Sequence, residues 1–350
     1  MGSINRAARR AIAKQGNKVI QLDQYLDRRI GTPYREEDGN YLLAGGNPTG
    51  GETIVRDWAH SDDKAAEEKT GIPLDPGIIK FGCDAIEANV ERIRAGKGIV
   101  DFPGLRNDTA VLIGAGASLG KYLANGRLPE FSFHGTTMVT NRALKPYADM
   151  GWDFDYAFFV DSQCHIFTKQ DWWQGLKGNP AGIIAATNTH PSVFDFKGQS
   201  YFFGHGSGCV KEWREKAIAC GIDEKKLGRL DSGYCALYSA LHFAYKQKAK
   251  RVILVGHDFS LVENKKYFDV PFHLPTEAPR MQQNPTEFNM VVREDLRGNV
   301  IVTQKYLENQ AKAIMMALLN MHRAGIEIIN ATSEGLLYGD WIKQVSLNEL

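Results

Sequence analysis

From Thr109 onward, short apolar segments alternate with helical stretches, and this alternation restricts the possible folds more than any other feature of the chain. It is typical of a mostly parallel sheet with helical crossovers. The predicted strands are residues 110–113, 137–140, 156–160, 182–186, 201–203, 251–255 and 326–329. Several are apolar at successive positions, as strands covered on both faces are. We therefore predict an α/β, Rossmann-like fold with helices on both faces of the sheet.

The first part of the chain differs in composition and pattern. Residues 1–105 are rich in polar residues and glycine and carry few strand signals, so we predict a smaller helical or irregular accessory region there. Ile86, Val90 and Ile93 have helical spacing, which predicts a helix leading into a main domain over residues 106–350.

Composition excludes several classes of protein. A 43% hydrophobic content is enough for a large core, and 42 Lys and Arg against 41 Asp and Glu give no indication of a nucleic-acid partner. The five cysteines form no Cys-x-x-Cys pair, which argues against a disulfide framework or a zinc site. No apolar run approaches the roughly 20 residues of a membrane span, and we predict a cytoplasmic protein. The sequence leaves open whether the protein is an oligomer.

A glycine-rich turn follows the first predicted strand. In Gly114-Ala-Gly116-Ala-Ser118-Leu-Gly120, the first two glycines permit tight backbone geometry, and a following helix offers amide groups to a phosphate. Ser118 adds a hydroxyl donor. The spacing matches neither the P-loop nor the dinucleotide fingerprint. The turn is therefore a candidate nucleotide site, and a close strand-to-helix turn without a ligand is the alternative.

Polar residues also follow the other predicted strands, and ligands of open α/β sheets bind outside the carboxyl ends of the strands. These residues are Asn141, Asp161, Asn188 with His190, His205, His257 with Asp258, and Asn330 with Thr332. Together with the glycine-rich turn after the first strand, these six strand ends make seven such positions, and they predict a site at this edge of the sheet.

Two carboxylates and one histidine are the candidate catalytic residues. Asp161 and Asp258 have the oxygen ligands that magnesium takes alongside substrate phosphates, so each is a candidate metal ligand or base. The alternative is an aspartate that accepts hydrogen bonds from backbone amides. His257 leaves a buried strand at the same edge and is suited to titrate near neutral pH. A purely structural His257 is the alternative.

Four segments together resemble a known family. They are residues 111–119, residues 231–237 with the strand end at 252–258, residues 295–303, and residues 329–335. Over residues 106–350 the chain resembles the archaeal-type 6-hydroxymethylpterin diphosphokinases and the related motility accessory factors, which are glycosyltransferase-like. A looser similarity links it to bacterial sialyltransferases, although residues 290–303 contain no counterpart of their catalytic histidine.

The resemblance implies a nucleotide-binding transferase domain. The nucleotide would be held by Gly114, Gly116, Ser118, Asn141, Ser232, Gly233, Asn330 and Thr332, with Asp161, His257 and Asp258 nearby and Mg²⁺ as a possible cofactor. A glycosyltransferase that uses a nucleotide sugar and a small-molecule or glycan acceptor is favoured by the long polar stretch 262–289, which mixes aromatic and donor side chains. The alternatives are a 6-hydroxymethyl-dihydropterin diphosphokinase using Mg-ATP and a non-catalytic nucleotide-binding or assembly protein.

Overall fold

The structure is a computed structural model. It describes residues 76–119, 134–149, 153–160, 162, 182–195, 198–206, 210–231, 235–260, 265–267, 270–271, 290–295, 300–332 and 335–350. Most of the predicted accessory region, residues 1–75, lies outside these residues.

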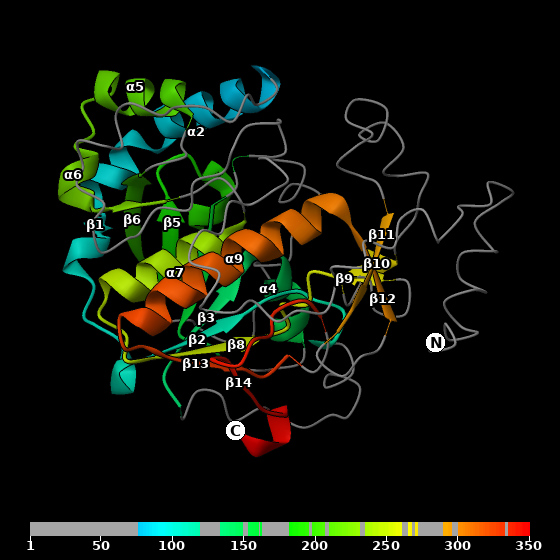
Figure 1. Ribbon diagram of the computed structural model, residues 1–350. Coiled ribbons are helices and arrows are strands. Elements are labelled where there is room, and N and C mark those ends of the chain that lie inside the picture. The colour runs from blue at the N-terminus through cyan, green and yellow to red at the C-terminus, as the bar shows by residue number, and fades with distance from the viewer. Residues whose placement is uncertain are drawn as a thin grey trace, which may run out of the picture.

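Ten of the described strands form one sheet in which every pair of neighbours is parallel (Figure 1). Nine strands run in the order β1-β6-β5-β4-β3-β2-β8-β13-β14, and β7 pairs with β6. Their bounds are β1 (Lys97–Gly98), β2 (Thr109–Ile113), β3 (Thr136–Thr140), β4 (Tyr156–Phe159), β5 (Gly182–Ala186), β6 (Gln199–His205), β7 (Arg229–Leu230), β8 (Arg251–Val255), β13 (Glu327–Asn330) and β14 (Lys343–Gln344). The predicted α/β fold and all seven predicted strands are confirmed.

The described helices connect these strands. The α-helices are α2 (Pro76–Ala95), α4 (Asn141–Asp149), α5 (Lys211–Ala219), α6 (Glu224–Leu227), α7 (Ala236–Lys246) and α9 (Lys305–Arg323). Short 3-10 turns occur at η4 (Ile99–Asp101), η5 (Arg106–Asp108), η8 (Pro191–Asp195) and η9 (Leu347–Glu349). Two antiparallel hairpins stand apart from the sheet, β9 (Lys265–Tyr267) with β10 (Val270–Pro271), and β11 (Met290–Glu294) with β12 (Val300–Gln304).

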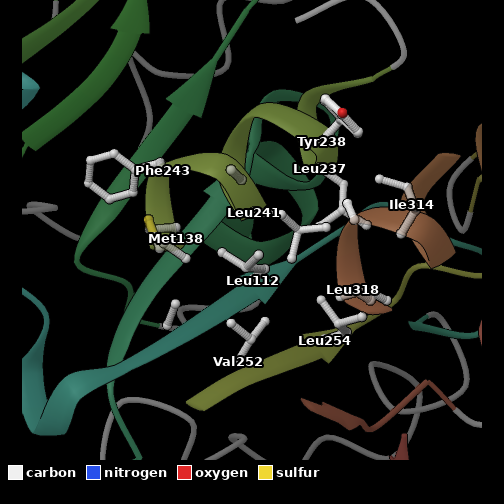
Figure 2. Packing of buried hydrophobic residues seen from close by; sticks show 14 of the residues in the cluster. Leu112, Met138, Leu237, Tyr238, Leu241, Phe243, Val252, Leu254, Ile314 and Leu318 are labelled. Carbon is white, nitrogen blue, oxygen red and sulfur yellow. The ribbon is translucent and has the colours of Figure 1, made fainter. Parts of the chain in front are cut away.

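One face of the sheet is covered by α7 and α9. Alternate residues of a strand point to opposite faces, so Leu112 of β2 and Leu254 of β8 meet Leu241 of α7 and Leu318 of α9 in one fully buried cluster (Figure 2). Burying a leucine of this kind stabilises the fold by about 2 kcal/mol. These contacts hold α9 against the middle of the sheet.

The opposite face is covered by α4 near the middle and by α2 and α5 toward the β1 edge. Val111 and Ile113 pack with Leu144 of α4, whereas Ile86 of α2 packs with Phe202 of β6. Helices on both faces explain why β2 is buried at all five positions. The helix predicted around residues 84–93 is part of α2, and both α2 and β1 precede residue 106. The domain division at residue 105 stays a prediction.

Candidate functional site

The carboxyl ends of β2, β8 and β13 form a tightly closed junction. Gly114 N donates to Val255 O at 2.8 Å, Gly116 N donates to Gly256 O at 2.7 Å, and Ala331 N donates to Leu254 O at 2.8 Å. The backbone that follows β8 is therefore clamped between the chain after β2 and the chain after β13. This junction holds the glycine turn, His257, Asp258, Asn330 and Thr332 of the predicted site.

Asp258 is bonded to the glycine turn. Its carboxylate accepts a hydrogen bond from Ser118 N at 2.7 Å and another from the Ser118 hydroxyl, and both residues are at most 1% exposed. The alternative to a catalytic Asp258 is an aspartate that accepts hydrogen bonds from backbone amides. The contact with Ser118 N is of this kind. Three amides that a phosphate would need, those of Gly114, Gly116 and Ser118, are thus already paired within the protein.

The glycines of this region allow chain segments to touch. A Cβ on Gly116 would lie 2.6 Å from the Gly256 carbonyl oxygen and 2.8 Å from the Asp258 carboxyl carbon. A Cβ on Gly114 would collide with the His257 ring, and Gly335 has a φ of +111° and lies against the Asp258 backbone. Glycine is required here by close approach of the chain to itself. The predicted contact of this turn with a nucleotide phosphate stays a prediction.

His257 is buried against Gly114. Its Nε2–H donates to Leu112 O at 3.2 Å, and its backbone N donates to the Thr332 hydroxyl at 3.1 Å. Burial lowers the pKa of His257 to about 4, which outweighs the opposite effect of the Leu112 hydrogen bond. The expectation that this histidine titrates near neutral pH is wrong, because a charged imidazolium here would be stripped of water. These contacts favour a structural role.

Asn330 and Thr332 fix the chain that leaves β13. Asn330 Nδ2 donates to Leu337 O at 2.7 Å, and Asn330 Oδ1 accepts from Thr332 N at 3.0 Å. Asn141, the first residue of α4, is buried at the end of β3, two strands from β8. The structure therefore gathers the described candidates at one edge of the sheet, as predicted. Their roles in binding a nucleotide stay predictions.

Three predicted site residues, Asp161, Ser232 and Gly233, lie outside the described residues. Within the described part of the chain, no group of three or more His, Cys, Asp or Glu side chains is arranged to hold a metal ion. Both Asp258 carboxylate oxygens already accept hydrogen bonds from Ser118, so this residue alone does not make a magnesium site. The predicted metal role of Asp161 and Asp258 stays a prediction.

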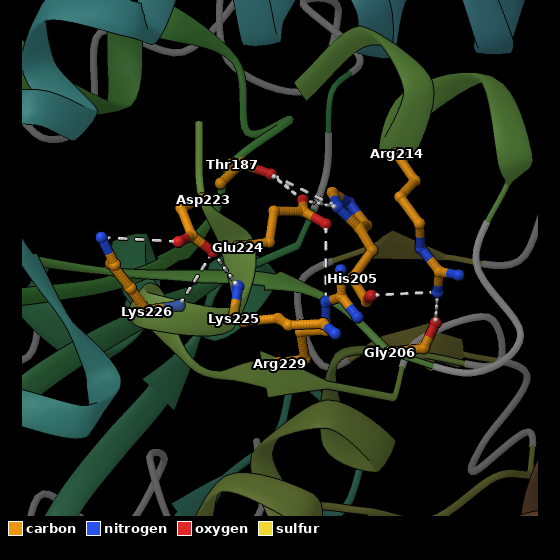
Figure 3. A network of polar contacts seen from close by, with 9 residues as sticks. All are labelled: Thr187, His205, Gly206, Arg214, Asp223, Glu224, Lys225, Lys226 and Arg229. Carbon is orange, nitrogen blue, oxygen red and sulfur yellow. Dashed lines mark hydrogen bonds and ion pairs between the residues drawn. The ribbon is translucent and has the colours of Figure 1, made fainter. Parts of the chain in front are cut away.

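A second polar cluster lies at the carboxyl ends of β5 and β6 (Figure 3). His205 Nδ1 lies 3.0 Å from Glu224 Oε1, and the Thr187 hydroxyl donates to the same oxygen at 3.2 Å. Arg229 Nε lies 3.9 Å from Glu224 Oε2. Arg214 donates to the carbonyl oxygens of His205 and Gly206 at 3.3 and 2.8 Å. We call these five side chains, Thr187, His205, Arg214, Glu224 and Arg229, the β6-end network.

The β6-end network places charge in the protein interior. Burial acts to raise the pKa of Glu224, but the hydrogen bond and charge of His205, helped by Arg229, hold that pKa below its usual value. His205 Nε2, Arg214 Nε and Glu224 Oε2 are buried without a hydrogen bond. The sequence indicated His205 at a strand end, but gave no signal for its pairing with Glu224.

Two further buried residues were missed by the sequence patterns. Ser260, just after β8, is 1% exposed, and Gln304, the last residue of β12, is fully buried. The Ser260 hydroxyl and both amide atoms of Gln304 have no hydrogen-bond partner. Ser260 could have been found as a polar residue that closely follows a predicted strand end. Gln304 comes one residue after the segment 295–303, and no sequence pattern pointed to it.

Comparison with known proteins finds a likeness among solved structures. No family model matches the chain, and no curated protein matches it either. Among solved structures, it is similar to the MAf glycosyltransferase from Magnetospirillum magneticum AMB-1, with a TM-score of 0.50 and 14% sequence identity. The likeness shows a shared fold. The aligned part covers 79% of this chain but only 40% of that protein.

The MAf likeness agrees with the predicted resemblance to the motility accessory factors. The resemblance to pterin diphosphokinases and to sialyltransferases stays a prediction. Among the described helices, none is long and apolar enough to cross a membrane.

Proposed function

We propose that this protein is a nucleotide-dependent, glycosyltransferase-like transferase whose donor binds at the carboxyl ends of β2, β8 and β13. The observation that carries the proposal is the gathering of buried polar residues at this edge in a fold shared with a MAf glycosyltransferase. Open α/β sheets bind their ligands at this edge. At the opposite edge of the sheet, the same strands begin with exposed charged residues, such as Arg251 of β8 and Glu327 of β13.

In the proposed reaction, an acceptor hydroxyl replaces the nucleotide on the sugar of the donor. The bond between the sugar carbon and the phosphate oxygen breaks, the acceptor oxygen bonds to that carbon, and the hydroxyl proton passes to water. The phosphate departs with the negative charge, so hydrogen-bond donors held in place before the reaction lower the barrier. The backbone hydrogen bonds that close the junction can hold such donors in a rigid arrangement.

Asp258 acts in this proposal as a positioning residue. It ties Ser118 to the strand end, and its own carbonyl oxygen accepts from Leu336 N at 2.9 Å. The chain segments after β2, β8 and β13 therefore keep one relative position. We expect Asp258→Asn to weaken nucleotide binding by displacing the turn, with a parallel loss of stability.

The test is a thermal-shift screen of the purified protein against ATP, CMP, UDP, GDP and representative nucleotide sugars, with and without magnesium. A ligand well above its dissociation constant raises the melting midpoint by mass action, and 100-fold excess corresponds to about 2.7 kcal/mol. We expect a shift with at least one nucleotide sugar, followed by hydrolysis of that donor in a nucleotide-release assay.

Two outcomes would contradict the proposal. A shift with Mg-ATP alone, together with AMP release on addition of 6-hydroxymethyl-dihydropterin, would identify a diphosphokinase instead. Binding of a nucleotide that is recovered intact after long incubation with any acceptor pool would identify a non-catalytic nucleotide-binding protein.

A further inference from the structure

The first turn of α9 lies at the same edge of the sheet as the junction. Because β8 and β13 are parallel neighbours and α9 runs back between them, the N-terminus of α9 lies on the side of their carboxyl ends. Figure 1 shows this end of α9 near the β11–β12 hairpin. The first N–H groups of a helix have no partner within it, and the N-terminus carries partial positive charge.

A direct hydrogen bond ties this helix start to the end of β8. The Thr303 hydroxyl donates to Phe259 O at 2.7 Å. Ser260 and Gln304 each come one residue after a partner in this bond, so both lie beside the start of α9. Gln304 is the N-cap residue of the helix, and its side chain makes no capping hydrogen bond.

Three side-chain atoms of Ser260 and Gln304 are buried without a hydrogen-bond partner. The Ser260 hydroxyl, Gln304 Nε2 and Gln304 Oε1 are all buried and unpaired, although their residues are at most 1% exposed. A buried polar group without a hydrogen bond costs about 1–3 kcal/mol, and a ligand that pairs with these atoms would remove that cost. The glycine turn differs, since its Ser118 donors are already bonded to Asp258.

The charged side chains next to the start of α9 are compatible with a bound anion. Glu308, in the first turn of α9, pairs with Arg293 at 2.6 Å and with Lys312 at 3.4 Å. One buried carboxylate is therefore matched by two cations. Its negative charge does not repel an incoming phosphate.

We propose that the start of α9 binds a phosphate group of the donor nucleotide. Ser260 Oγ and Gln304 Nε2 donate to the phosphate oxygens together with the free N–H groups of the first turn. Gln304 Oε1 accepts from a hydroxyl of the adjoining sugar. The proposal rests on the proposed function for the identity of the ligand. Because these atoms are buried without ligand, binding requires a local opening and is slower than diffusion.

The experiment uses the full-length protein and inorganic pyrophosphate as the probe, with binding measured by isothermal titration calorimetry at low salt. Gln304→Leu keeps the volume and removes both unpaired amide atoms, and Ser260→Ala removes only a hydroxyl. We expect each variant to bind pyrophosphate at least about tenfold more weakly, because hydrogen bonds to a charged ligand are the strong ones. Without pyrophosphate, the melting midpoint of Gln304→Leu equals or exceeds that of the wild type.

Gln247→Leu is the matched control. Gln247 caps the C-terminus of α7 at the opposite edge of the sheet, and its Nε2 donates to Ile99 O at 3.0 Å. We expect this variant to melt at a lower temperature and to bind pyrophosphate as the wild type does.

The outcomes separate this inference from the proposed function. Unchanged pyrophosphate affinity in both Gln304→Leu and Ser260→Ala would overturn the α9 site, even if the wild type transfers a sugar. Loss of pyrophosphate binding in these variants would support the site, even if no nucleotide sugar shifts the wild type. Failure of the wild type to bind pyrophosphate would overturn the site whatever the variants do.

Discussion

The junction of β2, β8 and β13 and the β6-end network stabilise buried polar groups in different ways. Both bury polar groups at the carboxyl ends of parallel strands. The junction uses backbone hydrogen bonds and glycines, and its histidine is neutral. The network instead balances Glu224 against His205 and Arg229, and leaves several polar atoms unpaired. The junction should therefore be sensitive to added volume, and the network to changes of charge.

The largest effect is expected in the network. Glu224→Ala removes the carboxylate that faces Arg229 and His205 and leaves His205 with only the Thr187 hydroxyl at 3.3 Å, which costs about 3–5 kcal/mol in the free energy of unfolding. Glu224→Gln keeps the volume and an acceptor, so we expect a smaller loss. Urea denaturation of the three proteins measures both values. Equal stability of Glu224→Ala and wild type would show that the carboxylate balances no charge.

Added volume at the junction comes next. Gly116→Ala places a Cβ 2.6 Å from the Gly256 carbonyl oxygen, where only backbone can move, and we expect a loss of about 3 kcal/mol. Gly325→Ala is the control, because Gly325 has a φ of +86° with open space around it and should lose only about 1 kcal/mol. A Gly116→Ala cost no larger than that of the control would mean that the junction is not closed.

Acid should act on the junction through His257. The folded-state pKa is about 4, below the usual 6.5, so the stability from its neutral form is present above pH 6.5 and is lost as the pH falls toward 4. Between pH 7 and pH 5 this amounts to about 2 kcal/mol. His257→Gln keeps a donor toward Leu112 and should flatten this part of the pH dependence. His322→Gln, at an exposed position near the end of α9, should leave it unchanged.

The smallest difference concerns two hydroxyls that donate to buried carboxylates. Ser118→Ala removes a donor to Asp258 and should cost about 2 kcal/mol. Thr187→Val removes the donor to Glu224, which keeps His205 as a partner, and should cost about 1 kcal/mol. Thermal denaturation of both variants gives the ranking. A reversed ranking would mean that the Asp258 carboxylate depends less on its hydroxyl donor than the Glu224 carboxylate does.

The sequence predicted the sheet well because its buried strands carry their own signal. β5 and β8 have the predicted bounds, since each is a run of apolar residues that both layers of helices cover. β1, β7 and β14 were missed, because two residues show no periodicity and their pairing depends on the neighbouring strand.

Polar residues after predicted strand ends were expected to share one edge of the sheet, and the described ones do, but their contacts could not be predicted. The bond between Ser118 and Asp258 joins residues 140 positions apart, and no local pattern reveals it. The burial of His257, which lowers its pKa, depends on the same long-range packing, and so do the unpaired atoms of Gln304.

The order of strands in the sheet also has a consequence for how the chain is made. β2 lies between β3 and β8, and Thr109 pairs with Arg251, so one edge of β2 has no partner until the ribosome has added the residues up to β8. At roughly 5–20 residues per second, that wait lasts on the order of ten seconds. Long-range parallel pairs also form slowly. Throughout this interval β2, whose five residues are all buried in the folded protein, presents an open hydrogen-bonding edge, so the nascent chain is most exposed to aggregation just before β8 is completed.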